Sequence, residues 1–328
     1  MRPPEPIVSV VIATFRRPDL LRRCLLALCA QRMDRRGFEV IVADDGCEPR
    51  IADLVAGLAA AHPGLALRYT AVVRTQGPAG ARNAGATLAR GELLAFTDDD
   101  TIPSPDWVRE GYLALAALPA WCAAAGRVVV PLPQRPTDHE RDTGGLAEAE
   151  FVTANCFVRR SAFERVGGFD ERFTRAWRED SDLQFRLEQQ VGPVGRIGGA
   201  VVEHPVRPAR WGSSAAAQAR VFFDALLFKK HPRLYRARIR RVPPWDYYAI
   251  VLAALVAIGA TLAGSVQVAA MAGTVWLVLT GAFCLRRLRG ASWTLPHVLE
   301  MLATSIVIPP LSLYWRLRGA LAFRTGFL

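Results

Sequence analysis

The sequence predicts an α/β fold with a mostly parallel sheet flanked by helices, followed by a hairpin of two membrane-spanning helices. Three observations support this prediction. Short apolar runs rich in Val and Ile alternate with stretches that have the apolar spacing of helices. Carboxylates follow two of these runs directly, at Asp44–Asp45 and at Asp98–Asp100. No charged residue occurs from Tyr247 to Leu285.

The first third of the chain shows the alternation of strands and helices most clearly. In chain order we expect a strand at 7–13, a helix at 20–31, a strand at 38–43, a helix at 51–61, a strand at 67–73, a helix at 78–89 and a strand at 93–96. Ligands of such sheets bind beyond the carboxyl ends of the strands. The acids at 44–45 and 98–100 are therefore expected to meet in one crevice.

After Trp107 the pattern becomes less regular. We expect a helix to about 118, a strand at 124–130, a loop at 131–145, a strand at 151–160, a short helix from 161, a turn at 167–171, a helix at 178–192 and a short strand at 200–202. Glu179, Asp180 and Asp182 would lie in the first turn of their helix, where acids also interact favourably with the helix dipole. The interaction with the helix dipole alone is therefore an alternative explanation for the acids at this helix start.

Asp98, Asp99 and Asp100 form the most informative cluster in the sequence. Neighbouring carboxylates repel one another, and their burial costs free energy unless a cation neutralises them. A hard divalent cation, Mg²⁺ or Mn²⁺, held together with a phosphate-bearing ligand suits such oxygen ligands. The alternative is an exposed acidic turn that caps the next helix.

The charge-free stretch is too long for one span of about 20 residues. Gly264–Ser265 divides it into two expected helices, at 247–263 and 266–285. Basic residues at 229–241 and 286–289 flank both ends, which places both ends in the cytoplasm. A buried hairpin of a soluble domain is the alternative, but neither helix has a polar face to meet water.

A third apolar segment, 295–315, is harder to interpret. It contains Glu300 and the pair Pro309–Pro310, and arginines follow it. We expect an interfacial or re-entrant segment there in preference to a third span.

Bulk properties limit the partners and the compartment. The chain has 328 residues and a formal net charge of +11, and its basic run at 229–241 adjoins apolar sequence and contains only one aromatic residue with a ring large enough for base stacking, Tyr235. Anionic lipid headgroups therefore fit this run better than nucleic acid. The six cysteines form no CxxC pair, which favours reduced thiols and disfavours a zinc site. The start at 1–6 lacks the apolar core of a signal peptide.

Several motifs in this order resemble one known family. The segments are Val8–Phe15, Val40–Gly46, Gly80–Gly85 (GARNAG), Thr97–Asp100 (TDDD), Gly167–Asp170 (GGFD) and Glu179–Asp182 (EDSD). They are similar to the opening strand, the nucleoside-binding strand end, the ARNxG segment, the DXD motif and the acceptor-side motifs of the family 2 glycosyltransferases, which have the GT-A fold. The resemblance covers about residues 6–215.

The resemblance implies how a nucleoside diphosphate sugar would be bound. Ala13 and Phe15 would line the pocket of the base, and Asp45 would hydrogen-bond to the base. Arg82 would approach the diphosphate, and Asp99 would belong to the same donor site.

The resemblance also implies the metal and catalytic residues. Asp98 would meet the ribose or the sugar and, together with Asp100, would bind Mn²⁺ or Mg²⁺. His204 stands where many relatives supply a histidine to the metal, although an imidazole packed in the core is an equally good interpretation. Asp180, with Glu179 beside it, would be the general base that deprotonates the acceptor hydroxyl.

These assignments lead to a division of the chain. The expected parts are a GT-A domain at 1–228, with a nucleotide-binding half at about 6–107 and an acceptor-binding half at about 108–228, a basic juxtamembrane linker at 229–246, a transmembrane hairpin at 247–285, and a basic loop with an interfacial, re-entrant or third membrane segment at 286–328.

The expected function is that of an inverting, metal-assisted glycosyltransferase at the cytoplasmic face of the inner membrane. One base opposite the leaving group means direct displacement, and hence inversion. The chain lacks the QxxRW motif of processive synthases after its acidic pair, so one sugar would be transferred per encounter. The acceptor would be a lipid-linked sugar or an envelope glycan. The alternatives are a non-catalytic, membrane-tethered scaffold that binds sugar nucleotides and, with less support, a nucleotidyltransferase.

Overall fold

The structure, a computed structural model, describes residues 6–327. The expectation for the start of the chain therefore lies mostly outside the described residues. The chain divides into two compact units. We call them the sheet unit, which comprises the residues up to Pro131 and Gly144–Val206, and the helical unit, which comprises Leu132–Thr143 and the residues from Arg207 onward.

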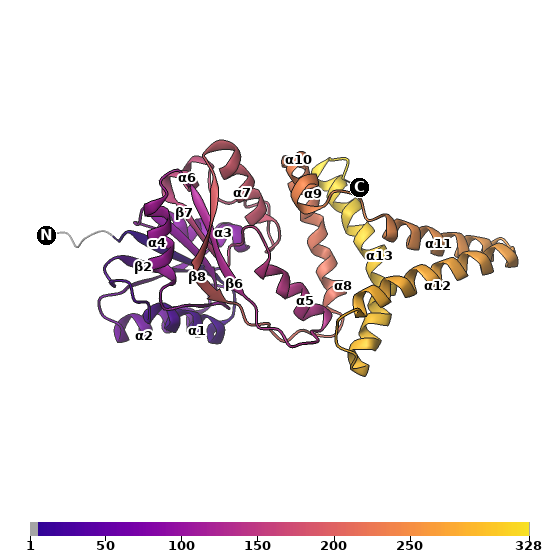
Figure 1. The fold of residues 1–328 in the computed structure, drawn as a ribbon, viewed down its shortest axis with the longest axis horizontal. Coiled ribbons are helices and arrows are strands. Elements are labelled where there is room, and N and C mark those ends of the chain that lie inside the picture. The colour runs from indigo at the N-terminus through magenta and orange to yellow at the C-terminus, as the bar shows by residue number, and fades with distance from the viewer. Residues whose placement is uncertain (1–5, 328) are drawn as a thin grey trace. The chain divides into compact units, whose positions relative to one another are not determined.

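The sheet unit has an eight-stranded sheet in the order β3-β2-β1-β4-β7-β6-β8-β5 within the described residues (Figure 1). The strands are β1 Val8–Thr14, β2 Phe38–Asp44, β3 Ala66–Ala71, β4 Leu93–Asp98, β5 Ile102–Pro103, β6 Ala123–Val129, β7 Asn155–Arg159 and β8 Val194–Glu203. The strands from β3 to β4 pair in parallel, as do β6 and β8, whereas β7 runs antiparallel to both of its neighbours. The predicted α/β fold with a mostly parallel sheet is confirmed.

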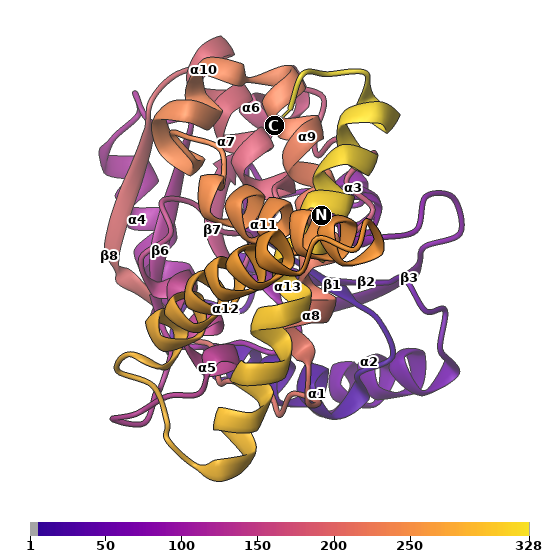
Figure 2. The ribbon, with the colours of Figure 1, turned by 90° about the vertical axis from the view of Figure 1, so that its right-hand side faces the viewer.

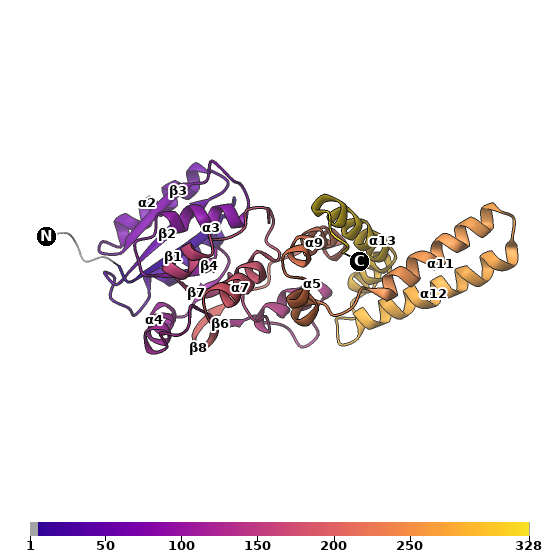
Figure 3. The same ribbon diagram turned by 90° about the horizontal axis from the view of Figure 1, so that it is seen from above.

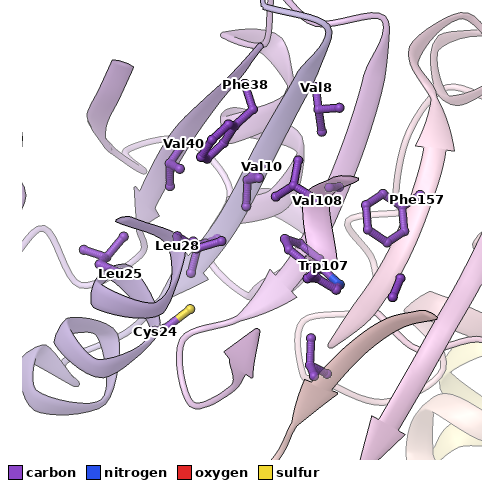
Figure 4. Packing of buried hydrophobic residues seen from close by; sticks show 14 of the residues in the cluster. Val8, Val10, Cys24, Leu25, Leu28, Phe38, Val40, Trp107, Val108 and Phe157 are labelled. Atoms are coloured by element: carbon purple, nitrogen blue, oxygen red, sulfur yellow. The ribbon is translucent and has the colours of Figure 1, made fainter. Parts of the chain in front are cut away.

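Helices cover both faces of the sheet because alternate residues of each strand point to opposite sides. The helices are α1 Pro18–Cys29, α2 Pro49–Ala61 and α4 Trp107–Ala117 on one face, and α3 Pro78–Thr87, α6 Arg160–Arg165 and α7 Glu179–Gln190 on the other. Val10 packs on the first face and Val11 on the second. Figure 4 shows the first core, in which the rings of Trp107 and Phe157 lie 5.0 Å apart.

Strand register brings the acidic segments to one edge of the sheet. β1 lies between β2 and β4, and it pairs Thr14 with Asp44 and Ala13 with Asp98. The carboxyl ends of these three strands are therefore neighbours, as the sequence predicted.

The helical unit is built around three long helices. Its elements are α5 Asp138–Gly144 (whose last residue belongs to the sheet unit), α8 Ser213–Ala217, α9 Val221–Lys230, α10 Pro232–Leu234, a π-helical turn at Tyr235–Ile239, α11 Trp245–Leu262, α12 Val266–Leu288 and α13 Leu295–Phe323. α11 and α12 lie side by side as a hairpin (Figures 2 and 3), and Gly264 takes a φ of 73° in the connecting turn. α11, α12 and α13 are long and apolar enough to cross a membrane, by length and composition alone.

We expected an interfacial or re-entrant segment at 295–315, and the structure has one continuous helix there. α13 runs as one helix of 29 residues through Pro309 and Pro310. A proline fixes φ at a helical value and removes one N–H donor, so packing can hold a helix together across it. That packing is present at the base of the hairpin, where Ile308 contacts Ile250 and Phe283.

A second correction concerns the expected loop at 131–145, which contains α5. Thr137 and Glu140 form a reciprocal capping box at its start. The Glu140 carboxylate accepts hydrogen bonds from the Thr137 N–H at 2.6 Å and from its hydroxyl at 2.9 Å, and the Glu140 N–H donates to the Thr137 hydroxyl. The T-x-x-E pattern was visible in the sequence and is typical of a helix start.

Candidate active site

Two carboxylates and one imidazole converge at the carboxyl end of β4. Asp98 ends that strand, Asp100 lies in the turn that follows, and His204 comes directly after β8. β5, immediately after the turn, pairs Ile102 with Glu203, which brings His204 to the acids. Ligand atoms of Asp98, Asp100 and His204 all lie within 4.8 Å of one another.

This group suits a divalent metal ion. The Nε2 atom of His204 lies 3.5 Å from an Asp100 carboxylate oxygen, and Asp100 and His204 are both buried. Nδ1 of His204 is also buried and has no hydrogen-bond partner among the described residues. Two carboxylates are ligands that Mg²⁺ and Mn²⁺ accept, and an imidazole extends the set toward transition metals. The donor set therefore fits Mn²⁺ well.

The middle carboxylate of the cluster points elsewhere. Asp99 accepts a hydrogen bond from the Thr14 hydroxyl at 2.8 Å and another from Arg17 at 3.3 Å. Burial raises the pKa of Asp99 to about 6, although Arg17 opposes the shift. Asp99 thus joins the end of β4 to the end of β1 and does not belong to the group of metal-ligating atoms.

Arg82 connects the two acidic clusters of the site. It lies on α3, and its guanidinium donates to Asp98 at 2.8 Å and to Glu179 at 3.0 Å. Burial by itself would lower the pKa of Arg82, but the two carboxylates outweigh that effect and raise it. Arg82 therefore stays charged and holds the start of α7 against the end of β4.

Glu179 and Asp180 begin α7 beside this arginine. Burial raises the pKa of Glu179, and the neighbouring Asp180 charge raises it further. Burial also raises the pKa of Asp180, even though the Ser181 N–H donates to its carboxylate at 2.6 Å. A carboxylate with a raised pKa accepts a proton more readily, as a general base must.

The residues assigned to the nucleoside lie at the ends of β1 and β2. Ala13 is half-buried within β1, and Phe15, just beyond the strand, is 47% exposed. One oxygen of Asp45 accepts from the Gly77 N–H at 2.9 Å, whereas its other oxygen is buried without a partner among the described residues. Such an oxygen can accept a hydrogen bond from a ligand. Asp44 instead accepts from the backbone of Gly46 and Glu48 and shapes the turn.

Asn83 is a site residue whose role the sequence did not reveal. Its amide donates to the Phe169 carbonyl and to Glu171, and it accepts from the Phe169 N–H, each at 2.9 Å. Gly168 has a φ of 71°, and a Cβ there would lie 2.7 Å from the Asn83 amide oxygen. Asn83 thus ties the turn at 167–171 to α3. Its place in the GARNAG segment was a signal, but the distant partner was not.

Comparison with known proteins identifies relatives of this chain. The family model described as "Glycosyl transferase family 2" matches residues 9–169. The chain is 31% identical over 228 residues to the validoxylamine A glucosyltransferase of Streptomyces hygroscopicus subsp. jinggangensis, covering 58% of this chain and 53% of that protein. It is 31% identical over 200 residues to the succinoglycan biosynthesis protein ExoO of Rhizobium meliloti, covering 58% of this chain and 56% of that protein. The chain therefore spans about half the length of these curated relatives.

A solved structure shares the fold. The mannosyltransferase PcManGT from Pyrobaculum calidifontis, solved in complex with GDP-Man and Mn²⁺, superposes with a TM-score of 0.60 at 22% sequence identity. The match covers 95% of this chain and 88% of the other.

Proposed function

We propose that this chain, which belongs to glycosyl transferase family 2, transfers one sugar from a nucleoside diphosphate sugar to an acceptor hydroxyl. The observation that carries the proposal is the convergence of Asp98, Asp100 and His204 next to the pair Glu179–Asp180, with Arg82 between them. One side of this site would hold a diphosphate, and the other would hold a hydroxyl group that is losing its proton.

Asp180 acts as the general base in the proposed reaction. It takes the proton of the acceptor hydroxyl while that oxygen forms a bond to the anomeric carbon. The bond from the anomeric carbon to the phosphate oxygen breaks, and the nucleoside diphosphate leaves with the bonding electrons. Because the base and the leaving group lie on opposite faces of the sugar, the configuration at this carbon inverts. Glu179 keeps Arg82 in place beside the base.

Asp98, Asp100 and His204 would hold a divalent cation, Mn²⁺ or Mg²⁺. When bound, this ion supplies positive charge for the diphosphate leaving group. Complexes of PcManGT with GDP-Man and Mn²⁺ support this part of the proposal by analogy. Asp45, with its free buried oxygen, would accept a hydrogen bond from an N–H group of the nucleobase, while Ala13 and Phe15 line the base pocket. Asp99 contributes through Thr14 and Arg17 by fixing the segment that carries the two carboxylate ligands, Asp98 and Asp100.

The helical unit supports a location at a membrane. Three helices could anchor the protein there, and arginines and lysines flank the hairpin at 229–241 and 286–289. This charge pattern favours the cytoplasmic face of the inner membrane for the active site. The similarity to ExoO, a succinoglycan biosynthesis protein, favours an acceptor on the way to an envelope glycan, and the anchor favours a lipid-linked one.

The full chain, purified in a neutral detergent, tests the proposal. UDP-, GDP- and dTDP-sugars are screened for release of nucleoside diphosphate with Mn²⁺, with Mg²⁺ and with a chelator. We expect release with one donor class, loss of release on chelation, and recovery when the metal is restored. No release from any donor would contradict the proposal.

The variant Asp180→Asn isolates the catalytic step. We expect kcat to fall by about 10²- to 10⁴-fold, the usual contribution of general base catalysis. Titration calorimetry with Mn²⁺ and the active nucleotide should give unchanged affinity. Glu188→Gln, which removes a carboxylate from the far part of the same helix, is the matched control and should retain full turnover. Equal kcat in parent and Asp180→Asn would exclude Asp180 as the base.

A further inference from the structure

The helical unit contains a hollow that the proposed active site does not use. Its volume is about 690 Å³, and it is lined by Phe228, Pro232, Arg233, Arg236, Ala237 and Arg241. Three of these six residues are arginines, and none is acidic. Within residues 6–327, none of the three arginines forms an ion pair with a carboxylate. The hollow therefore combines an apolar wall with uncompensated positive charge.

Local backbone structure explains why these arginines gather. The chain turns from α10 into the π-helical turn Tyr235–Ile239, which the hydrogen bond from the Arg240 N–H to the Tyr235 carbonyl closes at 2.9 Å. A π-helical turn is wider than an α-helical one, and such turns are frequent at functional sites. Tyr235 anchors the turn, since it is fully buried and its hydroxyl donates to Asp224 at 3.1 Å.

One of the arginines is held in place by an aromatic ring. The guanidinium of Arg236 lies 5.0 Å from the ring centre of Phe228, within the range of a cation–π contact. Phe228 in turn packs against Tyr235 and Phe327. Packed aromatic rings thus hold the guanidinium group of Arg236 in place, so less side-chain entropy is lost when its N–H groups bind an anion.

The hollow lies directly before the first apolar helix in the chain. Val242 and Trp245 follow Arg241 and are 54% and 64% exposed. Exposed Trp residues at the start of an apolar helix are typical of the boundary between membrane and water. If α11 enters the membrane, as the proposed function assumes, the three arginines lie at the depth of the lipid headgroups.

We propose that this hollow binds the phosphate of an anionic lipid headgroup. Arg guanidinium groups bind phosphate oxygens through paired hydrogen bonds, and three of them supply more donors than a single phosphate needs. Phe228, Pro232 and Ala237 provide an apolar wall for the glycerol and the upper acyl chain. The site thereby specifies a phosphorylated lipid, whereas a soluble phosphate would gain nothing from the apolar wall.

The test measures lipid binding by the full chain in neutral detergent, using dihexanoyl-phosphatidylglycerol and dihexanoyl-phosphatidylcholine. We expect the anionic lipid to bind and the zwitterionic one to bind far more weakly. The triple variant Arg233→Gln, Arg236→Gln, Arg241→Gln should lose about tenfold or more in affinity, given the usual contribution of each basic residue at an anionic surface. The matched control, Arg22→Gln, Arg23→Gln, Arg50→Gln, removes three exposed arginines of the sheet unit and should bind like the parent.

Further measurements distinguish a specific lipid site from general electrostatic attraction and from binding of other anions. Equal loss in the control variant would show general electrostatic attraction and overturn the proposal. Displacement of the lipid by the same concentration of inorganic phosphate, or by a short single-stranded DNA, would overturn the lipid assignment. A triple Arg→Lys variant keeps the charge but loses the paired donors, so its affinity should fall severalfold, and unchanged affinity would refute the pocket geometry. If the triple Gln variant does not fold, Arg233→Gln alone, at an exposed position, carries the same test.

The proposal rests on the membrane location within the proposed function, but the two can fail separately. Lipid binding at this hollow without any release of nucleoside diphosphate would contradict only the transferase activity. Release of nucleoside diphosphate by a parent chain that does not bind the anionic lipid would contradict only the lipid site.

Discussion

Burial at the start of α7 has opposite consequences for stability and for catalysis. A carboxyl group whose pKa rises on folding binds its proton more tightly in the folded chain than in the unfolded one. Its contribution to the free energy of unfolding therefore falls as the pH rises from the ordinary Asp value of 3.8 toward the raised value of Asp180. The rate should rise over the same pH range because the base must be deprotonated.

We expect Asp180→Asn to remove this pH-dependent destabilisation. The variant should gain stability relative to the parent as the pH rises above the ordinary Asp value of 3.8 toward the raised pKa of Asp180, by about 1.4 kcal/mol for each unit of pKa shift that is removed. Thermal unfolding of the full chain without metal or donor measures the difference at each pH. Glu188→Gln should show no such trend. A constant difference between Asp180→Asn and the parent would show that the Asp180 pKa is not raised.

The site residues differ in how far the sequence could predict them. The cluster Asp98–Asp100 was predicted to hold a cation because it follows a buried strand, the family resemblance implied Asp98 and Asp100 as the ligands, and their side chains do meet. The direction of Asp99, which turns toward Thr14, depends on the backbone of the turn and had no signal in the residue types. The role of Arg82 at the diphosphate stays a prediction, whereas its hydrogen bond to Glu179, which is 97 residues away in the chain, had no signal in the sequence.

At the scale of elements, a buried polar cluster joins α5, α8, α12 and α13 within the helical unit. Arg287 donates to Asp138 at 2.7 Å, to Ser214 at 2.9 Å and to the hydroxyls of Thr304 and Ser305. One guanidinium, which is almost fully buried, thus joins α12 and its neighbour α13 to α5 and α8, which lie more than 70 residues earlier in the chain. The polar residues of α13 therefore have partners inside the protein.

Two adjacent arginines, Arg286 and Arg287, allow the contribution of this cluster to the free energy of unfolding to be measured. Arg286 pairs with Asp246 at 2.7 Å, the same distance as the Arg287–Asp138 pair, but its side chain is 61% exposed. We expect Arg287→Ala to destabilise the chain by about 3 kcal/mol, because a half-buried carboxylate and three hydroxyls lose their partner. Arg286→Ala should cost about 1 kcal/mol or less. Denaturation in neutral detergent measures both, and similar losses would mean that the cluster does not hold α5.

The same elements show where sequence patterns fail. The absence of charged residues predicted the ends of both hairpin helices to within a few residues. In a membrane, an apolar segment of that length can satisfy its backbone hydrogen bonds only as a helix. The pair Pro309–Pro310 suggested a break that α13 does not have, since packing at the base of the hairpin outweighs the lost hydrogen bonds. β8 is longer than the expected strand at 200–202 because its residues 194–197 also pair with β6, and an irregularity at 198–200 separates them from the pairs at 201–203.

At the scale of the whole molecule, each unit has its own core. The two large clusters of buried side chains, one on each face of the sheet, lie wholly within the sheet unit. α9 belongs to the helical unit, where it packs against α13. Phe222 of this helix contacts Phe323 at a ring distance of 4.9 Å, and a Cβ at Gly319 would lie 2.6 Å from the Phe222 carbonyl oxygen. The position at which the chain is cut should therefore decide whether the sheet unit is soluble.

We expect a chain that ends at Val206 to be soluble and folded. It keeps both cores of the sheet unit and all of the proposed site residues, from Ala13 to His204. A chain that ends at Val242 keeps α9, with its buried Phe223, Leu226 and Leu227, but lacks α13, against which this helix packs. Exposed apolar surface of this kind leads to aggregation or to membrane binding.

Ultracentrifugation and gel filtration compare the two truncated chains, and calorimetry with Mn²⁺ and the active nucleotide measures their binding. The shorter chain should remain in the supernatant as one species with the nucleotide affinity of the full chain, whereas the longer one should sediment. Because the longer chain contains the whole of the shorter one, a difference in this direction isolates the effect of residues 207–242. Sedimentation of the shorter chain together with solubility of the longer one would mean that α9 completes the sheet unit, and that the division between the two units lies nearer the hairpin.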